Sequence, residues 1–171
     1  IQNIRCQCRG YGGERYGVIP EAAPQGALPG VYLDGARYVR DTVKLFAGIR
    51  DKIGYDVKLI HDVHERVAPP EAVKLARELE PFDLLFLEDP VCAEQTKWLR
   101  EIRCHSGVPI AQGELFNRSI DWRDLISGHL IDYIRVHISQ IGGITPARKL
   151  QMFAEQYGVR TAWHGPGDMS P

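Results

Sequence analysis

Residues 57–66 read VKLIHDVHER, an apolar segment that ends in two histidines, an aspartate and a glutamate. Strand alternation over Val57–His64 would place Asp62 and His64 on one face and His61 on the other. Polar groups buried at the end of a strand are costly unless they have partners. The segment therefore predicts a strand whose C-terminal end contributes Asp62 and His64 to a site, while His61 packs outward against a helix.

The same pattern, a short apolar strand followed by an amphipathic helix, repeats along the chain. Strict alternation with continuously apolar strands predicts a parallel sheet with helical crossovers. The expected strands are Asn3–Cys8, Val57–His64, Leu84–Asp89, Pro109–Glu114, Ile131–Ser139 and Arg160–His164. The expected helices are Ala36–Ile53, Pro70–Leu79, Glu94–His105, Ile120–Ser127 and Pro146–Tyr157.

Two α/β folds fit this alternation. A doubly wound sheet suits a chain of 171 residues, but Gly10-x-Gly12-Gly13 and Gly142-Gly143 do not match the phosphate-binding fingerprint GxGxxG. An eight-stranded (β/α) barrel needs about 250 residues, so the strands visible here would form part of one. Residues 10–35 are rich in Gly, Pro and Ala and predict a long flexible loop.

Composition limits the kinds of partner. The chain is 44% hydrophobic and 25% charged, with a formal net charge of -1. This is the profile of a globular domain, and it gives no electrostatic reason to expect nucleic acid or an anionic membrane. No apolar run approaches the ~18 residues of a transmembrane helix. Cys6-Gln7-Cys8 lacks the CxxC spacing and Cys92 and Cys104 lie far apart, so a reducing compartment, the cytoplasm, is expected.

Three acidic residues follow three successive apolar strands at equal intervals. Asp62, Glu88 and Glu114 are separated by 88 − 62 = 26 and 114 − 88 = 26 residues. In a parallel barrel or sheet they would meet at the carboxyl edge, where the sites of such folds lie. Carboxylates at that distance repel one another unless a cation lies between them, and hard oxygen ligands suit Mg²⁺. We therefore expect a Mg²⁺ site rather than three unrelated strand ends.

Basic side chains share this expected edge. His64 has the parity of Asp62, and an imidazole there suits proton transfer near neutral pH. Arg135 and His137 also share parity, and His164 ends the last expected strand. Arg135 is a candidate for binding a substrate carboxylate or hydroxyl, with an ordinary buried ion pair as the alternative.

The segments VKLIHDVHER, LLFLEDP, AQGELFN, IDYIRVHISQIGGITPARK and VRTAWHGPGDMSP resemble the D-mannonate dehydratase family of acid-sugar dehydratases, in the enolase superfamily. The resemblance runs almost continuously over residues 55–171, and NIRCQC with RYGV matches more loosely. It implies that residues 1–171 form a partial (β/α)8 TIM-type barrel, cut from a longer chain without its capping domain. It also implies a homo-oligomer.

The resemblance assigns a role to each matched residue. The metal ligands would be Asp62, Glu88 and Glu114. Tyr16, assisted by Arg5, would remove the proton beside the substrate carboxylate, and Tyr11 is the alternative base. His64 would be the acid that helps the 3-hydroxyl leave. The substrate contacts would be Glu114, Arg135, His164 and Asp168.

The reaction that the resemblance implies is the Mg²⁺-dependent dehydration of D-mannonate or D-gluconate to 2-keto-3-deoxy-gluconate, through a metal-stabilised enediolate. Pro166 stands where efficient family members tend to have Ala, which implies low efficiency or activity directed to gluconate. The alternative is a non-catalytic or regulatory homologue of the starvation-sensing type that retains the metal site. A racemase of the same superfamily would need Lys bases on the second strand, and none follows Arg5.

Overall fold

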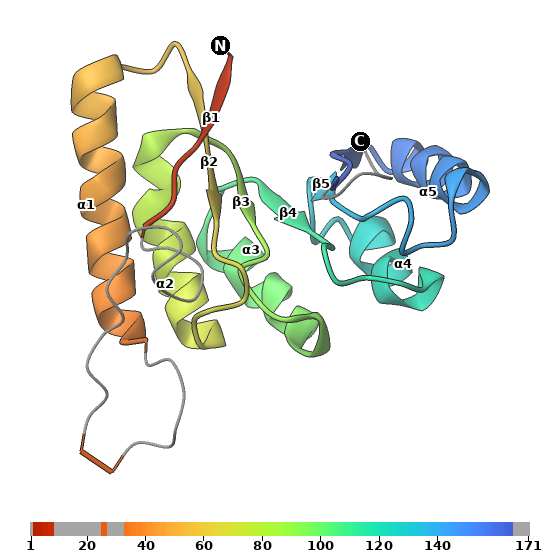
Figure 1. Ribbon diagram of the computed structural model, residues 1–171, viewed down its shortest axis with the longest axis horizontal. Helices are drawn as coiled ribbons and strands as arrows, with labels where there is room; N and C mark the ends of the chain where they lie inside the picture. Colours follow the sequence, from red (N-terminus) through yellow and green to blue (C-terminus); the bar gives the residue numbers. More distant parts are fainter. Residues whose placement is uncertain (1, 9–24, 27–32, 166–171) are drawn as a thin grey trace.

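The computed structural model describes residues 2–8, 25–26 and 33–165 (Figure 1). Within them, six strands form one parallel sheet in the order β1-β2-β3-β4-β5-β6. The strands are β1 (Asn3–Arg5), β2 (Lys58–Asp62), β3 (Leu84–Glu88), β4 (Ile110–Gln112), β5 (Tyr133–Ile134) and β6 (Arg160–Thr161). Most of the loop expected at 10–35 lies outside the described residues.

The helices follow the strands in sequence and form a second layer. They are α1 (Gly35–Ile53), α2 (Pro69–Leu79), α3 (Leu99–His105), α4 (Ser119–Ser127) and α5 (Ile144–Gln156), with short 3-10 segments η2 (Glu80–Phe82) and η3 (Ala93–Trp98). In the structure α1 packs on α2, α2 on α3, and α4 on α5 (Figure 1). A sheet order that never reverses, joined by right-handed crossovers, puts every helix on one face. The fold is therefore the barrel type, not the doubly wound sheet.

Local sequence explains where α1 and α2 begin. Asp34 precedes α1, and its side chain accepts a hydrogen bond from the backbone N–H of Arg37 at 2.9 Å. Pro69 and Pro70 occupy the first positions of α2, where a missing N–H costs nothing. Both helices start one residue before the position expected from the sequence.

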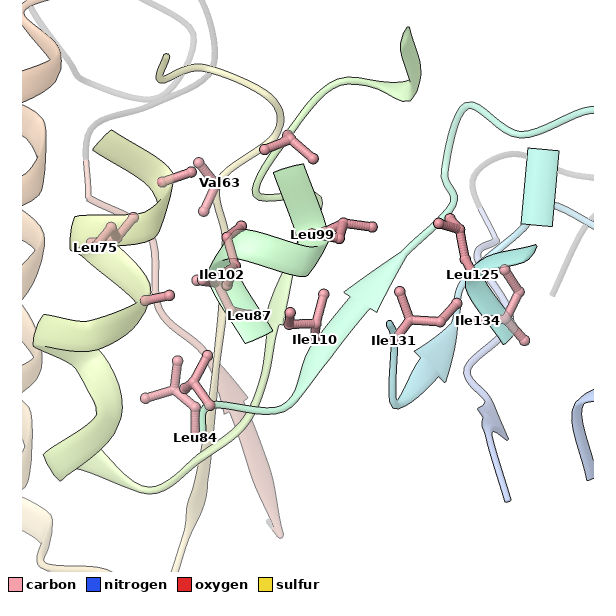
Figure 2. Packing of buried hydrophobic residues seen from close by; sticks show 14 of the residues in the cluster. Val63, Leu75, Leu84, Leu87, Leu99, Ile102, Ile110, Leu125, Ile131 and Ile134 are labelled. Atoms are coloured by element: carbon pink, nitrogen blue, oxygen red, sulfur yellow. The ribbon is translucent and has the colours of Figure 1, made fainter. Parts of the chain in front are cut away.

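The hydrophobic core lies between the strands and the helix layer (Figure 2). Leu87 of β3 and Ile110 of β4 are register partners, and both are completely buried. They face Leu75 of α2 and Leu99 and Ile102 of α3, which are buried to the same degree. Each such side chain contributes about 1.5–3 kcal/mol. This packing fixes the strand ends, so residues of the other parity are held on the opposite face.

Arg50 is a buried cation that links α1 to the segments before β2 and β3. It is 5% exposed and projects from the buried face of α1. All five of its N–H groups donate to backbone carbonyls, those of Gly54, Val57, Phe82 and Asp83, at 2.7–3.1 Å. Arg50 therefore ties the end of α1 to the chain just before β2 and β3.

Several strands end earlier than the sequence predicted. The expectation that the second strand reaches His64 is wrong, because β2 ends at Asp62 and His64 has a left-handed backbone (φ 53). The expectation that the fourth reaches Glu114 is wrong as well, because β4 ends at Gln112 and Gly113 has φ 136.

The last two strands and the third helix are also shorter than expected. Regular pairing of β5 and β6 covers two residues each, and a single parallel bridge then joins His137 to His164. The expected helix Glu94–His105 is divided into η3 and α3, with a non-helical backbone at Gln95 (φ -113, ψ 18). No helix among the described residues is long and apolar enough to cross a membrane.

Candidate metal and catalytic site

Asp62 and Glu88 lie side by side at the carboxyl edge of the sheet. They end β2 and β3, and they are register partners. Partners on neighbouring parallel strands face the same side, so both carboxylates point to the face opposite Leu87. Asp62 is 2% and Glu88 0% exposed. With buried Asp89, each offers an oxygen within 4.8 Å of the others, and these three residues are called the carboxylate cluster below.

Two guanidinium groups compensate the charge of Glu88. Arg5 pairs with one carboxylate oxygen of Glu88 and Arg135 with the other. Arg5 Nη1 also lies 3.5 Å from Asp62 Oδ2, and Gln7 Nε2 donates to the same oxygen at 3.5 Å. The structure thus gives Arg135 the buried ion pair that was the alternative expectation, and a substrate contact stays a prediction.

Asp89 is a site residue that the sequence reasoning did not single out. Burial raises the pKa of Asp89 well above its ordinary value, and the neighbouring charges of Glu88 and Asp62 add to the rise. Its Oδ1 accepts a hydrogen bond from the Gly113 N–H at 2.9 Å. Asp89 therefore joins the end of β3 to the turn after β4. Its position next to Glu88 in LEDP was the signal available in the sequence.

Glu114 reaches the inner face because of Gly113. Ala111 is the register partner of Glu88, so simple alternation would place Glu114 with Gln112 on the outer face. Gly113 has φ 136, a conformation that side-chain-bearing residues rarely adopt. The chain turns there, and the carboxylate of Glu114 then lies among histidines on the inner face.

Three histidines surround Glu114. Its Oε2 lies 3.3 Å from His64 Nδ1 and 3.4 Å from His164 Nε2. The hydrogen bond with His164 lowers the pKa of Glu114 to about 2, and the charges of His164, His64 and His137 assist while burial opposes. Glu114 is therefore ionised throughout the neutral range.

His64 lies beside the carboxylates of the site, but strand alternation does not put it there. The parity argument fails, because β2 has ended and the left-handed backbone turns the side chain. Even so, His64 Nδ1 lies 3.9 Å from Asp62 Oδ2 and 3.3 Å from Glu114 Oε2, so the ring is close to both carboxylates. Its side chain is 40% exposed, so the ring borders the solvent side of the site.

The rings of His137 and His164 contact each other, tilted by 44°, just beyond the ends of β5 and β6. Their ring centroids are 4.2 Å apart, and their backbones form the isolated bridge. Burial, followed by the charge of His164, lowers the pKa of His137. Glu114, His137 and His164 each offer a ligand atom within 4.8 Å of the others, and they are called the histidine cluster below. The sequence placed His137 on the face of Arg135, but no role was predicted for it.

The prediction that His61 packs outward is confirmed. Its side chain is completely buried against α1, where Tyr38 stacks on it and Phe46 meets it edge-on. His61 Nδ1 lies 2.8 Å from the Cys6 carbonyl, which can only accept, so Nδ1 carries the proton. Nε2, 2.8 Å from the Tyr38 hydroxyl, therefore accepts. Burial lowers the pKa of His61 to about 4, so the ring is neutral.

Four of the predicted site residues lie outside the part of the chain that the structure describes. The three predicted metal ligands fall into two groups of neighbouring side chains. Tyr16, Tyr11, Pro166 and Asp168 lie outside the described residues. Asp62 and Glu88 share a group with Asp89, whereas Glu114 groups with the histidines. The roles assigned to these residues, to Arg5 and to His64 stay predictions.

Sequence comparison gives the relatives of the chain. Residues 21–171 match the family described as enolase C-terminal domain-like. A D-galactonate dehydratase family member from Enterococcus gallinarum is 50% identical over 169 residues, which are 99% of this chain and 41% of the relative. Another from Musicola paradisiaca is 47% identical over 184 residues, covering 99% and 44%. The chain thus spans less than half of the length of these curated relatives.

Structural comparison agrees. A crystal structure of an enolase from Pantoea ananatis with bound D-gluconate and Mg has a TM-score of 0.89 and 46% identity, over 98% of this chain and 44% of that chain. The 3,6-anhydro-D-galactonate cycloisomerase from Zobellia galactanivorans has a TM-score of 0.70 and 29% identity, over 75% and 37%. The relatives carry the D-galactonate dehydratase name, so mannonate dehydratase is a finer assignment than they support. The chain belongs to the enolase C-terminal domain-like family, as a C-terminal domain of the enolase superfamily.

Proposed function

We propose that this chain carries the metal site and much of the catalytic surface of a Mg²⁺-dependent sugar acid dehydratase. The observation that carries the proposal is the pair of buried carboxylates, Asp62 and Glu88, at the carboxyl edge of a parallel sheet. Arginines and histidines surround this pair, as binding and protonating a sugar acid requires. The Pantoea relative, 46% identical, was solved with D-gluconate and Mg bound.

The donor set of the carboxylate cluster fits Mg²⁺. Asp62, Glu88 and Asp89 offer only oxygen ligands, which a small hard cation prefers. Three buried carboxylates also need a positive charge, which Arg5 and Arg135 supply in the structure. A bound cation would compete with those two guanidinium groups for the oxygens of Glu88. Glu114 stays the predicted third ligand.

Three of the basic side chains at the site are proposed to have roles in this reaction. Arg135 would bind the carboxylate or a hydroxyl of the sugar acid, because its planar fork matches such oxygens. His64, close to Glu114 and partly exposed, would donate a proton to the departing 3-hydroxyl. His164, 3.9 Å from Glu88 and 3.4 Å from Glu114, would contact substrate oxygens. Bound Mg²⁺ would supply positive charge where negative charge develops next to the substrate carboxylate.

Residues outside the described part complete the proposal. Tyr16, assisted by Arg5, is proposed to remove the proton beside the carboxylate, with Asp168 as a further substrate contact. D-mannonate and D-gluconate differ only at the carbon that loses its proton, so both give 2-keto-3-deoxy-gluconate. Pro166 implies low efficiency. A cytoplasmic homo-oligomer remains the expected setting.

A substrate panel tests the proposal. The protein is incubated with D-gluconate, D-mannonate and D-galactonate, with Mg²⁺ or with a chelator, and the 2-keto-3-deoxy acid is quantified. We expect slow Mg²⁺-dependent product from gluconate or mannonate. Folded protein that binds these acids without turning any of them over would support the non-catalytic alternative, and protein that neither binds nor converts them would refute both.

A further inference from the structure

Asp89 belongs to the carboxylate cluster by distance, but its hydrogen bonds differ from those of Glu88. Glu88 pairs with the side chains of Arg5 and Arg135, which can move aside for a cation. Asp89 Oδ1 instead accepts from a backbone donor, the Gly113 N–H, at 2.9 Å. This bond is buried, and a cation could replace it only by rearranging the chain after β4.

We infer that Asp89 is a positioning residue of the proposed dehydratase rather than a metal ligand. It holds the turns after β2 and β4, and so sets where His64 and Glu114 lie relative to each other. Its effect on turnover rests on the proposed function, whereas the positioning itself can be measured without a substrate.

The backbone of Asp89 joins the ends of three strands. Its N–H donates to the Ala111 carbonyl of β4, and its carbonyl accepts from the Glu65 N–H just beyond β2, both at 2.9 Å. The side chain adds the bond to the Gly113 N–H just beyond β4. One residue at the end of β3 therefore anchors the turn that follows each neighbouring strand.

These two turns carry side chains that are proposed to act in the reaction. His64 precedes Glu65, and Glu114 follows Gly113. The 3.3 Å between His64 Nδ1 and Glu114 Oε2 joins the turn after β2 to the histidine cluster. Because Asp89 is bonded to the neighbour of each residue, loss of its acceptor should disturb this distance. A shift of about 1 Å at reacting groups can lower a rate about a hundredfold.

The conformation of Asp89 allows the hydrogen bond to be tested apart from the backbone. Its φ is 39, in the left-handed region that Asn and Asp enter more readily than other residues with side chains. Asn in its place would keep both this conformation and the Oδ1 acceptor. Gly would keep the conformation and lose the acceptor.

Hydrogen exchange of the Gly113 amide, followed by NMR, tests the positioning directly. We expect slow exchange in the wild type and in Asp89→Asn, and loss of this protection in Asp89→Gly. Asp83→Gly is the matched control, because Asp83 lies just before β3, has φ 46 and has a side chain that is 53% exposed. It should exchange at Gly113 like the wild type.

Calorimetric titration with Mg²⁺ separates positioning from ligation. Asp89→Asn should bind Mg²⁺ with less than about a tenfold loss of affinity, whereas removal of a direct ligand would cost no less than the 10- to 100-fold typical of a supporting residue. With D-gluconate, Asp89→Gly should lower kcat by about 10- to 100-fold, and Asp89→Asn should recover most of that loss. Asp83→Gly should turn over like the wild type.

Three results would overturn the inference. They are unchanged Gly113 exchange in folded Asp89→Gly, a loss of Mg²⁺ affinity in Asp89→Asn of tenfold or more, and equal kcat for Asp89→Gly and the wild type. If circular dichroism shows that Asp89→Gly is unfolded, the Mg²⁺ titration of Asp89→Asn decides alone. A wild type without turnover would refute the proposed function, but the exchange and titration results would still decide the role of Asp89.

Discussion

Acidification should destabilise the fold through one buried side chain, His61. The neutral ring donates from Nδ1 to the Cys6 carbonyl and accepts at Nε2 from the Tyr38 hydroxyl. Protonation would put a second donor against that hydroxyl inside a fully buried pocket, so the folded state resists it. Neutral His61 thus connects β2 to Cys6, the residue after β1, and to α1.

The magnitude follows from proton linkage. Burial lowers the pKa of His61 from 6.5 to about 4, and 6.5 − 4 at about 1.4 kcal/mol per pKa unit gives about 3 kcal/mol. Between these two values the unfolded chain binds the proton and the folded chain does not. The contribution of neutral His61 to the free energy of unfolding is therefore fully present above pH 6.5. It is lost as the pH falls towards 4, and it changes little below pH 4.

Urea denaturation from pH 7 to pH 4 measures the effect. His61→Asn does not titrate, so at pH 7 it should be less stable than the wild type, and the difference should shrink by about 3 kcal/mol by pH 4. The other titrating groups are shared and cancel. His105→Gln, an exposed histidine, should follow the wild type at every pH. A difference between the wild type and His61→Asn that stays constant over this range would refute the reasoning, as would a pKa near 6.5 for His61 by NMR.

Two further substitutions test the packing that positions the site. Arg50→Lys removes most of five hydrogen bonds to carbonyls and should lower the free energy of unfolding by about 3 kcal/mol, whereas exposed Arg100→Lys should change it by less than about 0.5 kcal/mol. Equal urea midpoints for these variants would contradict the role of Arg50. Gly113→Ala should lower the free energy of unfolding by about 1–3 kcal/mol, because the φ of Gly113 is 136 and the new Cβ would lie 3.1 Å from Phe116. Gly48→Ala, in open space on α1, should instead stabilise by up to about 1 kcal/mol, and a Gly113→Ala variant as stable as the wild type would refute the proposed turn.

The strand and helix order could be predicted from sequence because it depends on local periodicity. Apolar strands alternate with amphipathic helices, and every expected element exists in the structure. Element ends were less predictable, because they depend on single backbone conformations. The left-handed φ of His64 and the positive φ of Gly113 end their strands early, and hydrophobic pattern carries no record of either.

The site was predictable in its location but not in its internal pairing. Asp62 and Glu88 follow from position at strand ends, and their register pairing agrees. The ion pairs of Glu88 with Arg5 and Arg135 join residues 83 and 47 positions apart, which a single sequence does not indicate. Glu114 shares the inner face with the other two carboxylates only because Gly113 reverses its side, and its nearest partners there are His64 and His164.

Asp62 and Glu88 are proposed to hold, together with Glu114, the Mg²⁺ of a sugar acid dehydratase. The most direct measurement is Mg²⁺-dependent formation of 2-keto-3-deoxy-gluconate from D-gluconate by the wild type, Glu88→Gln and Glu101→Gln, a control on the exposed surface of α3. We expect slow product formation by the wild type and by Glu101→Gln, and none by folded Glu88→Gln. Equal turnover by Glu88→Gln and the wild type, or turnover that a chelator leaves unchanged, would contradict this proposal.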